Sequence, residues 1–218
     1  MEDSNYKYNT KDLIQRYPAL KVCENSIIES YNILVNCFKN GGKLLIAGNG
    51  GSCADSEHIV GELMKGFKKR RPVSDEFAKI LTSVDPERGS ELAAKLQGGL
   101  PCIALDSHQG LNTAFTNDVD NGGLLTYAQQ LYACGNSNDV FLGISTSGNS
   151  KNVMYAAVVA KAKGMKVIGL TGATGGKLNT IADVCIKAPE TETFMIQEYH
   201  LPIYHCLCLM LENEFFTK

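Results

Sequence analysis

The sequence predicts an α/β protein built on a parallel five-stranded sheet flanked by helices, a three-layer sandwich. Three observations predict it: five short apolar runs, helical patterns between them, and polar, glycine-rich turns directly after three of the runs. Strands that are apolar almost throughout are buried on both faces, as in parallel sheets. The expected strands are 43–47, 101–105, 139–144, 165–170 and 183–187.

Helical patterns fill the segments between the expected strands and at both ends of the chain. We expect two helices within about 10–39, and further helices at about 52–66, 111–117, 122–133, 150–163 and 194–216. In parallel sheets, ligands bind beyond the carboxyl ends of the strands. The polar turns 48–52, 145–150 and 171–176 each follow a strand, so we expect them to line one edge of the sheet.

A segment of about 67–100 interrupts this alternation. It is much longer than the usual connection of about 2–6 residues. We therefore interpret it as an insertion with its own structure, with possible helices at 73–81 and 91–96 around the turn 85–89. The basic run 68–71 is interpreted as a solvated helix end. The 218 residues are expected to form a single domain that carries this insertion.

Composition excludes several classes of function. The net charge of −2 gives no general attraction for nucleic acid or for an anionic membrane, and no apolar run is long enough to span a bilayer. The first ten residues are polar and lack the apolar core of a signal peptide. The eight cysteines are therefore expected to be reduced and mostly buried, in a cytoplasmic protein.

The strongest chemical signal is the turn 145–150, which we call the phosphate turn. Ser145, Thr146, Ser147 and Ser150 place four hydroxyl groups in six positions, more than the capping of one helix needs. Hydroxyl groups, turn N–H groups and a helix N-terminus together supply the converging donors that a phosphate monoester requires. The turn therefore predicts a phosphate site.

The sequence matches two nucleotide-binding motifs only in part. The run 48–51 begins like a dinucleotide fingerprint, but Cys53 stands where the third glycine belongs. The run 175–177 resembles a P-loop, but Leu178 replaces the Ser or Thr that would bind Mg²⁺. No nucleotide cofactor is expected.

Two further pairs of side chains have the spacing of a functional site. His58 and Glu62 are four residues apart on an expected helix, and Gln197 and His205 are just over two turns apart on another. Each pair alone is more often an ordinary polar contact. Together, and beside a phosphate site, they match either a zinc-type ligand set or a pair that moves protons.

Taken in order, these motifs resemble the SIS-fold phosphosugar isomerases. The order is GNGGS at 48–52, H-x3-E at 58–62, Asn117-Asp118, STSGNS at 145–150 and IQE-x6-H at 196–205. The resemblance is closest to the phosphoheptose isomerases, which convert sedoheptulose 7-phosphate to D-glycero-D-manno-heptose 7-phosphate. It covers nearly the whole chain apart from the insertion and implies the SIS fold, a flavodoxin-like or Rossmann-like sandwich.

The resemblance also implies roles for individual residues. Substrate contacts are implied for Asn49, Gly50, Gly51, Ser52, Glu62, Asn117, Asp118, Ser145, Thr146, Ser147, Ser150 and Gln197. A zinc ion is implied at His58, Glu62, Gln197 and His205. Glu62 and His205 are also the implied acid/base residues, and whether Glu62 acts as base, as zinc ligand or as both stays open. Members of the family are homotetramers with active sites near subunit interfaces, which implies a homo-oligomer here.

The chemistry that we expect is proton transfer between C1 and C2 of an open-chain ketose phosphate through an enediol. Glu62 is assigned as the base and His205 as its acid/base partner on the opposite side. One alternative is a non-catalytic SIS protein that senses a sugar phosphate or binds a protein partner, and another is an isomerase of a different sugar phosphate. The presence of both pairs, His58 with Glu62 and Gln197 with His205, argues against the non-catalytic protein, which has no use for them.

The sequence departs from the family in two places. The insertion is compatible with covering the site, with thickening a subunit interface or with changing the choice of substrate. Phe194 stands three positions before Gln197, where better-known members carry an acidic residue.

Overall fold

The computed structural model describes residues 8–216 and confirms the predicted α/β class. Its sheet has the order β2-β1-β3-β4-β5, and all neighbouring strands are parallel. The strands are β1 Leu44–Ala47, β2 Cys102–Ala104, β3 Val140–Ile144, β4 Lys166–Thr171 and β5 Val184–Lys187. The chain runs outward from β1 to β2 and returns to β3 on the other side. The carboxyl ends of β1 and β3 therefore mark the place where open α/β sheets bind ligands.

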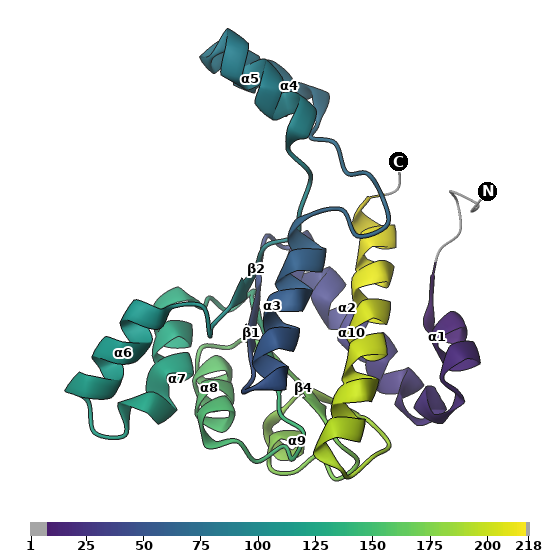
Figure 1. Cartoon of the computed structure of the whole chain (residues 1–218), viewed down its shortest axis with the longest axis vertical. Coiled ribbons are helices and arrows are strands. Elements are labelled where there is room, and N and C mark those ends of the chain that lie inside the picture. The colour runs from purple at the N-terminus through teal and green to yellow at the C-terminus, as the bar shows by residue number, and fades with distance from the viewer. Residues whose placement is uncertain (1–7, 217–218) are drawn as a thin grey trace.

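Helices cover both faces of this sheet (Figure 1). They are α1 Thr10–Arg16, α2 Glu24–Lys39, α3 Gly51–Met64, α4 Asp75–Val84, α5 Pro86–Lys95, α6 Gln109–Asp118, α7 Gly122–Cys134, α8 Lys151–Ala162, α9 Leu178–Ile181 and α10 Thr193–Phe215. A 3₁₀ segment, Pro18–Cys23, stands between α1 and α2. The first helical region is thus divided at Pro18, whose ring nitrogen cannot donate a helix hydrogen bond.

Alternate residues of the strands enter two separate cores. Leu44 and Ile46 of β1 belong to the core formed with α2, α3 and α10. Leu45 and Ala47 of the same strand belong to the core formed with α7, α8 and α9. Both faces of the sheet are therefore buried, which is why each strand appears in the sequence as a continuous apolar run.

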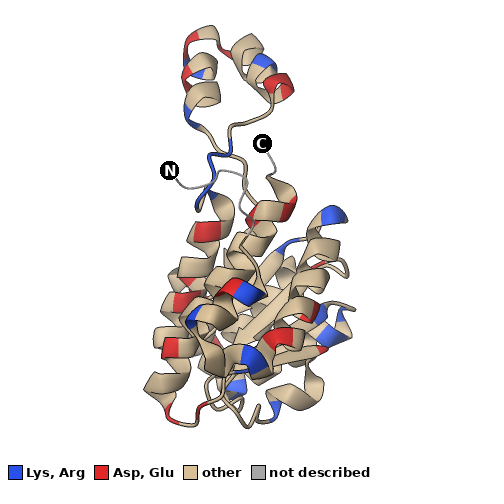
Figure 2. Cartoon of the chain, turned by 90° about the vertical axis from the view of Figure 1, so that its right-hand side faces the viewer, with Lys and Arg blue, Asp and Glu red and all other residues tan. Residues whose placement is uncertain are grey.

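The segment expected to be an insertion forms a helical arm, defined here as α4 and α5. Figures 1 and 2 show the arm projecting from the body of the protein. Only Asp85 separates its helices, so α5 begins at Pro86 and earlier than expected. Asp85 accepts hydrogen bonds from two backbone N–H groups of the following turn, and proline is favoured at the first helical position.

The expectation of a solvated helix end at 68–71 is wrong for Arg71. This run lies in the connection between α3 and the arm, beyond the end of α3 at Met64, and Arg71 is only 1% exposed. Its Nε donates to Oε1 of Glu212 on α10 over 2.9 Å. The sequence gives no local sign of this burial, because the two residues are 141 positions apart.

Between residues 8 and 216, none of the helices combines the length and the apolar character that a bilayer crossing needs.

Candidate active site

The phosphate turn connects β3 to α8, at the predicted edge of the sheet. Ser150 is the N-cap residue of α8, but its Oγ pairs with Oγ of Ser145 over 2.9 Å and does not cap the helix. Oγ of Ser147 accepts from the backbone N–H of Asn149 over 3.2 Å. Capping of α8 therefore does not account for these hydroxyl groups. The turn leads directly into the N-terminus of α8, a position of the kind that binds phosphate in other proteins.

The turn after β4 packs closely against the phosphate turn. Gly148 has a φ of +65°, and a Cβ atom added to it would lie 2.1 Å from the carbonyl oxygen of Gly175. The backbone N–H of Lys177 also donates to Oδ1 of Asn149 over 3.1 Å. The two turns can approach each other only because position 148 carries no side chain.

Gly148→Ala is therefore expected to destabilise the protein and to weaken sugar-phosphate binding. The left-handed backbone alone costs an alanine about 1–2 kcal/mol, and the clash with Gly175 adds to this. Urea denaturation and the KM for a sugar phosphate measure the two effects. Gly110→Ala is the matched control, because a Cβ there meets nothing within 4 Å. It lies in the first turn of α6, where the change is expected to alter stability by less than about 1 kcal/mol. Equal stability of the two variants would contradict the prediction.

A cavity of about 200 Å³ opens beside the phosphate turn. Three segments line it, contributing Thr146, Ser147 and Asn149, then Gly172, Ala173 and Thr174, and finally Glu190, Thr191, Thr193 and Ile196. The turn after β4 thus lies at the site as the sequence predicts. The 190–193 segment was not predicted to line it, because it follows β5 without a glycine-rich signature.

The turn after β1 lies between the phosphate turn and α10. The side chains of Asn49 and Asn152 exchange hydrogen bonds of 2.9 and 2.8 Å, which join this turn to α8. Ser52 is buried at the start of α3. A Cβ atom added to Gly51 would lie 2.7 Å from Nε2 of Gln197. The glycines after β1 therefore allow a side chain of α10 to reach the sheet edge.

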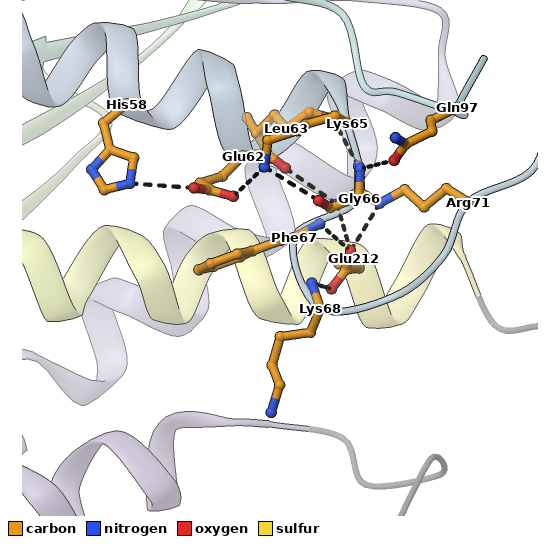
Figure 3. Close-up of polar contacts among 10 residues, drawn as sticks. All are labelled: His58, Glu62, Leu63, Lys65, Gly66, Phe67, Lys68, Arg71, Gln97 and Glu212. Carbon is orange, nitrogen blue, oxygen red and sulfur yellow. Dashed lines mark hydrogen bonds and ion pairs between the residues drawn. The ribbon is translucent and has the colours of Figure 1, made fainter. Parts of the chain in front are cut away.

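His58 and Glu62 on α3 face His205 on α10, whereas Gln197 lies beside Gly51 at the start of α3. Nε2 of His58 lies 3.3 Å from Oε1 of Glu62, and the rings of His58 and His205 meet edge-on with centroids 5.0 Å apart. Nζ of Lys65 contacts the other carboxylate oxygen of Glu62, Oε2, over 3.2 Å. Figure 3 shows Glu62 between His58 and Lys65 on one side of α3. Lys65 was missed, although its spacing of three residues from Glu62 is typical of a helix ion pair.

His205 combines burial with an unused ring nitrogen. Its Nε2 is buried and has no hydrogen-bond partner within the part of the chain that the structure describes. Burial, together with the neighbouring His58, lowers the pKa of His205 below its ordinary value of 6.5. The ring is thus kept neutral near pH 7 and has a nitrogen free to take up or to give a proton, or to bind a metal.

Arg71 and Glu212 hold the two helices together. Nη1 and Nη2 of Arg71 donate to the carbonyl oxygens of Leu63 and Glu62 over 2.9 and 3.2 Å, as Figure 3 shows. These carbonyl groups belong to the last turn of α3, where helical partners are lacking. Since Glu212 lies on α10, this buried ion pair ties the helix of Glu62 to the helix of His205. Arg71 and Glu212 were both missed as residues that shape the site.

Asn117 and Asp118 are not brought to the site within one chain. They lie in the last turn of α6, where both are exposed and Nδ2 of Asn117 donates to Oδ1 of Asp118 over 2.9 Å. Figure 1 shows α6 on the far side of α7 and α8 from the pair α3 and α10. Their role as substrate contacts therefore rests on the sequence resemblance alone.

The residues implied as zinc ligands carry nitrogen and oxygen donors that zinc accepts, and one pair of them, His58 and Glu62, also has the spacing of two zinc ligands. Tetrahedral zinc with ligand distances of about 2.0–2.1 Å places two donor atoms about 3.3 Å apart, and His58 Nε2 and Glu62 Oε1 have this separation. The partnerless Nε2 of His205 is a further nitrogen donor. Within residues 8–216, however, no group of three or more His, Cys, Asp or Glu side chains is close enough together to hold one metal ion.

The arm leaves the site of its own chain uncovered. In Figure 1 the arm lies at the opposite end of the molecule from α9 and the start of α10, which border the phosphate turn and its cavity. Phe194, one of the two departures noted in the sequence, is 57% exposed in the first turn of α10.

Comparison with known proteins identifies close relatives of this chain. The SIS domain family pattern matches residues 91–172. The chain is 40% identical over 184 residues to a phosphoheptose isomerase of Aneurinibacillus thermoaerophilus, covering 84% of this chain and 79% of that protein. It is 33% identical to one from Burkholderia pseudomallei over the full length of both. The solved structure of a phosphoheptose isomerase from Francisella tularensis is also similar, with 30% identity, a TM-score of 0.74 and coverage of 94% of each chain.

Proposed function

The chain belongs to the phosphoheptose isomerase family, and on this premise we propose that it interconverts sedoheptulose 7-phosphate and D-glycero-D-manno-heptose 7-phosphate. The observation that carries the proposal is the packing of His58 and Glu62 on α3 against His205 on α10, in a chain whose β3–α8 connection is the hydroxyl-rich phosphate turn. A sensor of sugar phosphates needs the turn but has no use for an acid/base pair.

The phosphate turn binds the substrate phosphate and fixes the sugar in position. Glu62 removes a proton from C1 of the open-chain ketose, which produces an enediol, and a proton is returned to C2. His205 acts from the opposite side and moves the proton between the two oxygen atoms, so that O1 becomes the carbonyl oxygen of the aldose. Lys65 holds Oε2 of Glu62 and leaves Oε1 for the proton.

Turnover in D₂O tests the proposed reaction. Incubation with sedoheptulose 7-phosphate is expected to give the aldose with deuterium at C2, because the transferred proton exchanges with solvent on Glu62. NMR of the product detects the label. Tight binding of sugar phosphates without turnover of any ketose phosphate would favour the non-catalytic alternative, and turnover of a different ketose phosphate would identify another substrate.

A zinc ion held by His58, Glu62, Gln197 and His205 is part of the proposal. When bound, zinc polarises the carbonyl and hydroxyl oxygens of the sugar as a Lewis acid. The supporting observations are the donor types, the 3.3 Å spacing of His58 and Glu62 and the buried, partnerless nitrogen of His205. A carboxylate cannot be a tight zinc ligand and a free base at the same time, so Glu62 serves the two roles in turn.

Removal of zinc is expected to lower kcat by about 100-fold, since a Lewis acid contributes several kcal/mol to such reactions. The measurement is turnover of sedoheptulose 7-phosphate after dialysis against a chelator, followed by addition of ZnCl₂. Recovery with zinc and not with magnesium is expected from the nitrogen ligands. Full turnover by metal-free protein would refute the zinc proposal and leave the isomerase proposal intact.

We also propose a cytoplasmic homotetramer, as the family resemblance implies. Light scattering of the purified protein tests the oligomeric state. The position of Asn117 and Asp118, away from the site of their own chain, is consistent with a contribution to the site of a neighbouring subunit.

A further inference from the structure

A buried tyrosine connects two side chains of α3. The hydroxyl group of Tyr204, on α10, donates a hydrogen bond to Oδ1 of Asp55 over 3.2 Å and lies 2.9 Å from Nδ1 of His58. Asp55 precedes His58 by three residues, so both side chains lie on the same side of α3. Tyr204 is 2% exposed, and its ring packs edge-on against the ring of His58. The hydroxyl group of Tyr204 therefore has a fixed position between Asp55 and His58.

The single proton of this hydroxyl group sets the direction of both bonds. Because the proton of Tyr204 goes to Asp55, the hydroxyl oxygen accepts from His58. The hydrogen of the neutral imidazole is then on Nδ1, and the lone pair is on Nε2. Asp55 and Tyr204 thus select one of the two tautomers of His58.

The selected lone pair is directed at a carboxylate. Nε2 of His58 lies 3.3 Å from Oε1 of Glu62. Two acceptor atoms at this distance repel each other unless a positive charge lies between them. Lys65 does not supply this charge, because it contacts the other oxygen of Glu62. A cation between His58 and Glu62 resolves the repulsion, and the spacing is that of two ligands of one tetrahedral zinc ion.

We propose that Tyr204 is a positioning residue for metal binding, which together with Asp55 holds His58 in the tautomer whose Nε2 accepts zinc beside Glu62. The inference rests on the zinc site of the proposed function. A carboxylate or hydroxyl partner on the second ring nitrogen orients a metal-bound histidine and raises its basicity. Tyr204 does this without being a ligand, and no motif in the sequence marks it.

Tyr204→Phe tests the proposal, because it removes the hydroxyl group and keeps the buried ring. The affinity for zinc, measured with ZnCl₂ against a chelating dye, is expected to fall about 10- to 100-fold. Nitrogen-15 NMR of histidine-labelled, zinc-free protein provides a second measurement, at a pH where His58 is neutral. The chain has four histidines, so few ring signals need to be assigned. Wild-type His58 is expected to carry its hydrogen on Nδ1, and the variant to lose this preference.

Tyr31→Phe is the matched control, because it removes a tyrosine hydroxyl that is bonded to Glu214, away from the site. Zinc affinity and the His58 tautomer are expected to be unchanged in it. An unchanged zinc affinity in Tyr204→Phe, or an unchanged tautomer, would overturn the proposal. Both measurements are made without substrate. Failure of the wild type to turn over sedoheptulose 7-phosphate would therefore refute the proposed reaction and not this inference.

Discussion

Glu62→Gln is expected to lower kcat for sedoheptulose 7-phosphate by about 10²- to 10⁴-fold, the contribution of a positioned general base. The amide has the shape of the carboxylate but cannot take a proton from carbon. Its oxygen can still accept from Lys65, and the backbone carbonyl of residue 62 keeps its hydrogen bond from Arg71. The loss of activity is therefore expected without loss of the fold.

Steady-state kinetics and zinc affinity, measured on the same variant, separate the two roles of Glu62. Loss of turnover with normal zinc affinity identifies the residue as the base, whereas loss of both identifies it as a ligand as well. Glu57→Gln is the control, because it makes the same change of charge at an exposed position of α3. Near-normal turnover by Glu62→Gln would refute the assignment.

Arg71→Leu is expected to lower the free energy of unfolding by about 3–5 kcal/mol, the usual cost of removing one partner of a buried ion pair. Glu212 would keep its hydrogen bonds from the N–H groups of Phe67 and Lys68 but lose its buried counter-charge. Burial alone raises the pKa of Glu212, but these N–H groups and Arg71 outweigh it, so the pKa lies below its ordinary value of 4.5. The carboxylate thus depends on its partners to stay ionised.

Urea denaturation measures this loss of stability. Arg70→Leu is the matched control, because it removes the same charge from the neighbouring, exposed position and is expected to change stability by less than about 0.5 kcal/mol. Equal stability of the two variants would show that the buried pair does not hold α3 against α10.

The fold could be predicted because each strand of a buried parallel sheet is visible in the sequence as a short apolar run. Each strand is apolar on both faces, and the turns after β1, β3 and β4 are rich in glycine or hydroxyl groups, so their positions along the chain predicted the edge of the sheet where they lie. The 190–193 segment has no such signature and was not predicted. The boundary between the helices of the arm also had a local signal in Asp85 and Pro86, which was read as a longer turn.

The arrangement of the site could be predicted only in part. His58 and Glu62 lie on one helix, so their spacing determines their proximity. Their approach to His205 depends on how α3 packs against α10, and that packing depends on Arg71 and Glu212. A basic residue in a basic run looks solvated when its partner is 141 positions away. The helix-to-helix contacts were therefore beyond the reach of local patterns.

The position of α10 in the chain has a consequence for synthesis. This helix follows every other element that the structure describes, and it carries Gln197, Tyr204, His205 and Glu212. A growing polypeptide thus contains the whole sheet and the phosphate turn before any of these side chains exists. Until α10 has been made, Arg71 has no counter-charge and the core formed with α2 and α3 stays open on one side. The ion pair of Arg71 and the proposed acid/base pair of Glu62 and His205 can therefore form only after this one helix has been made.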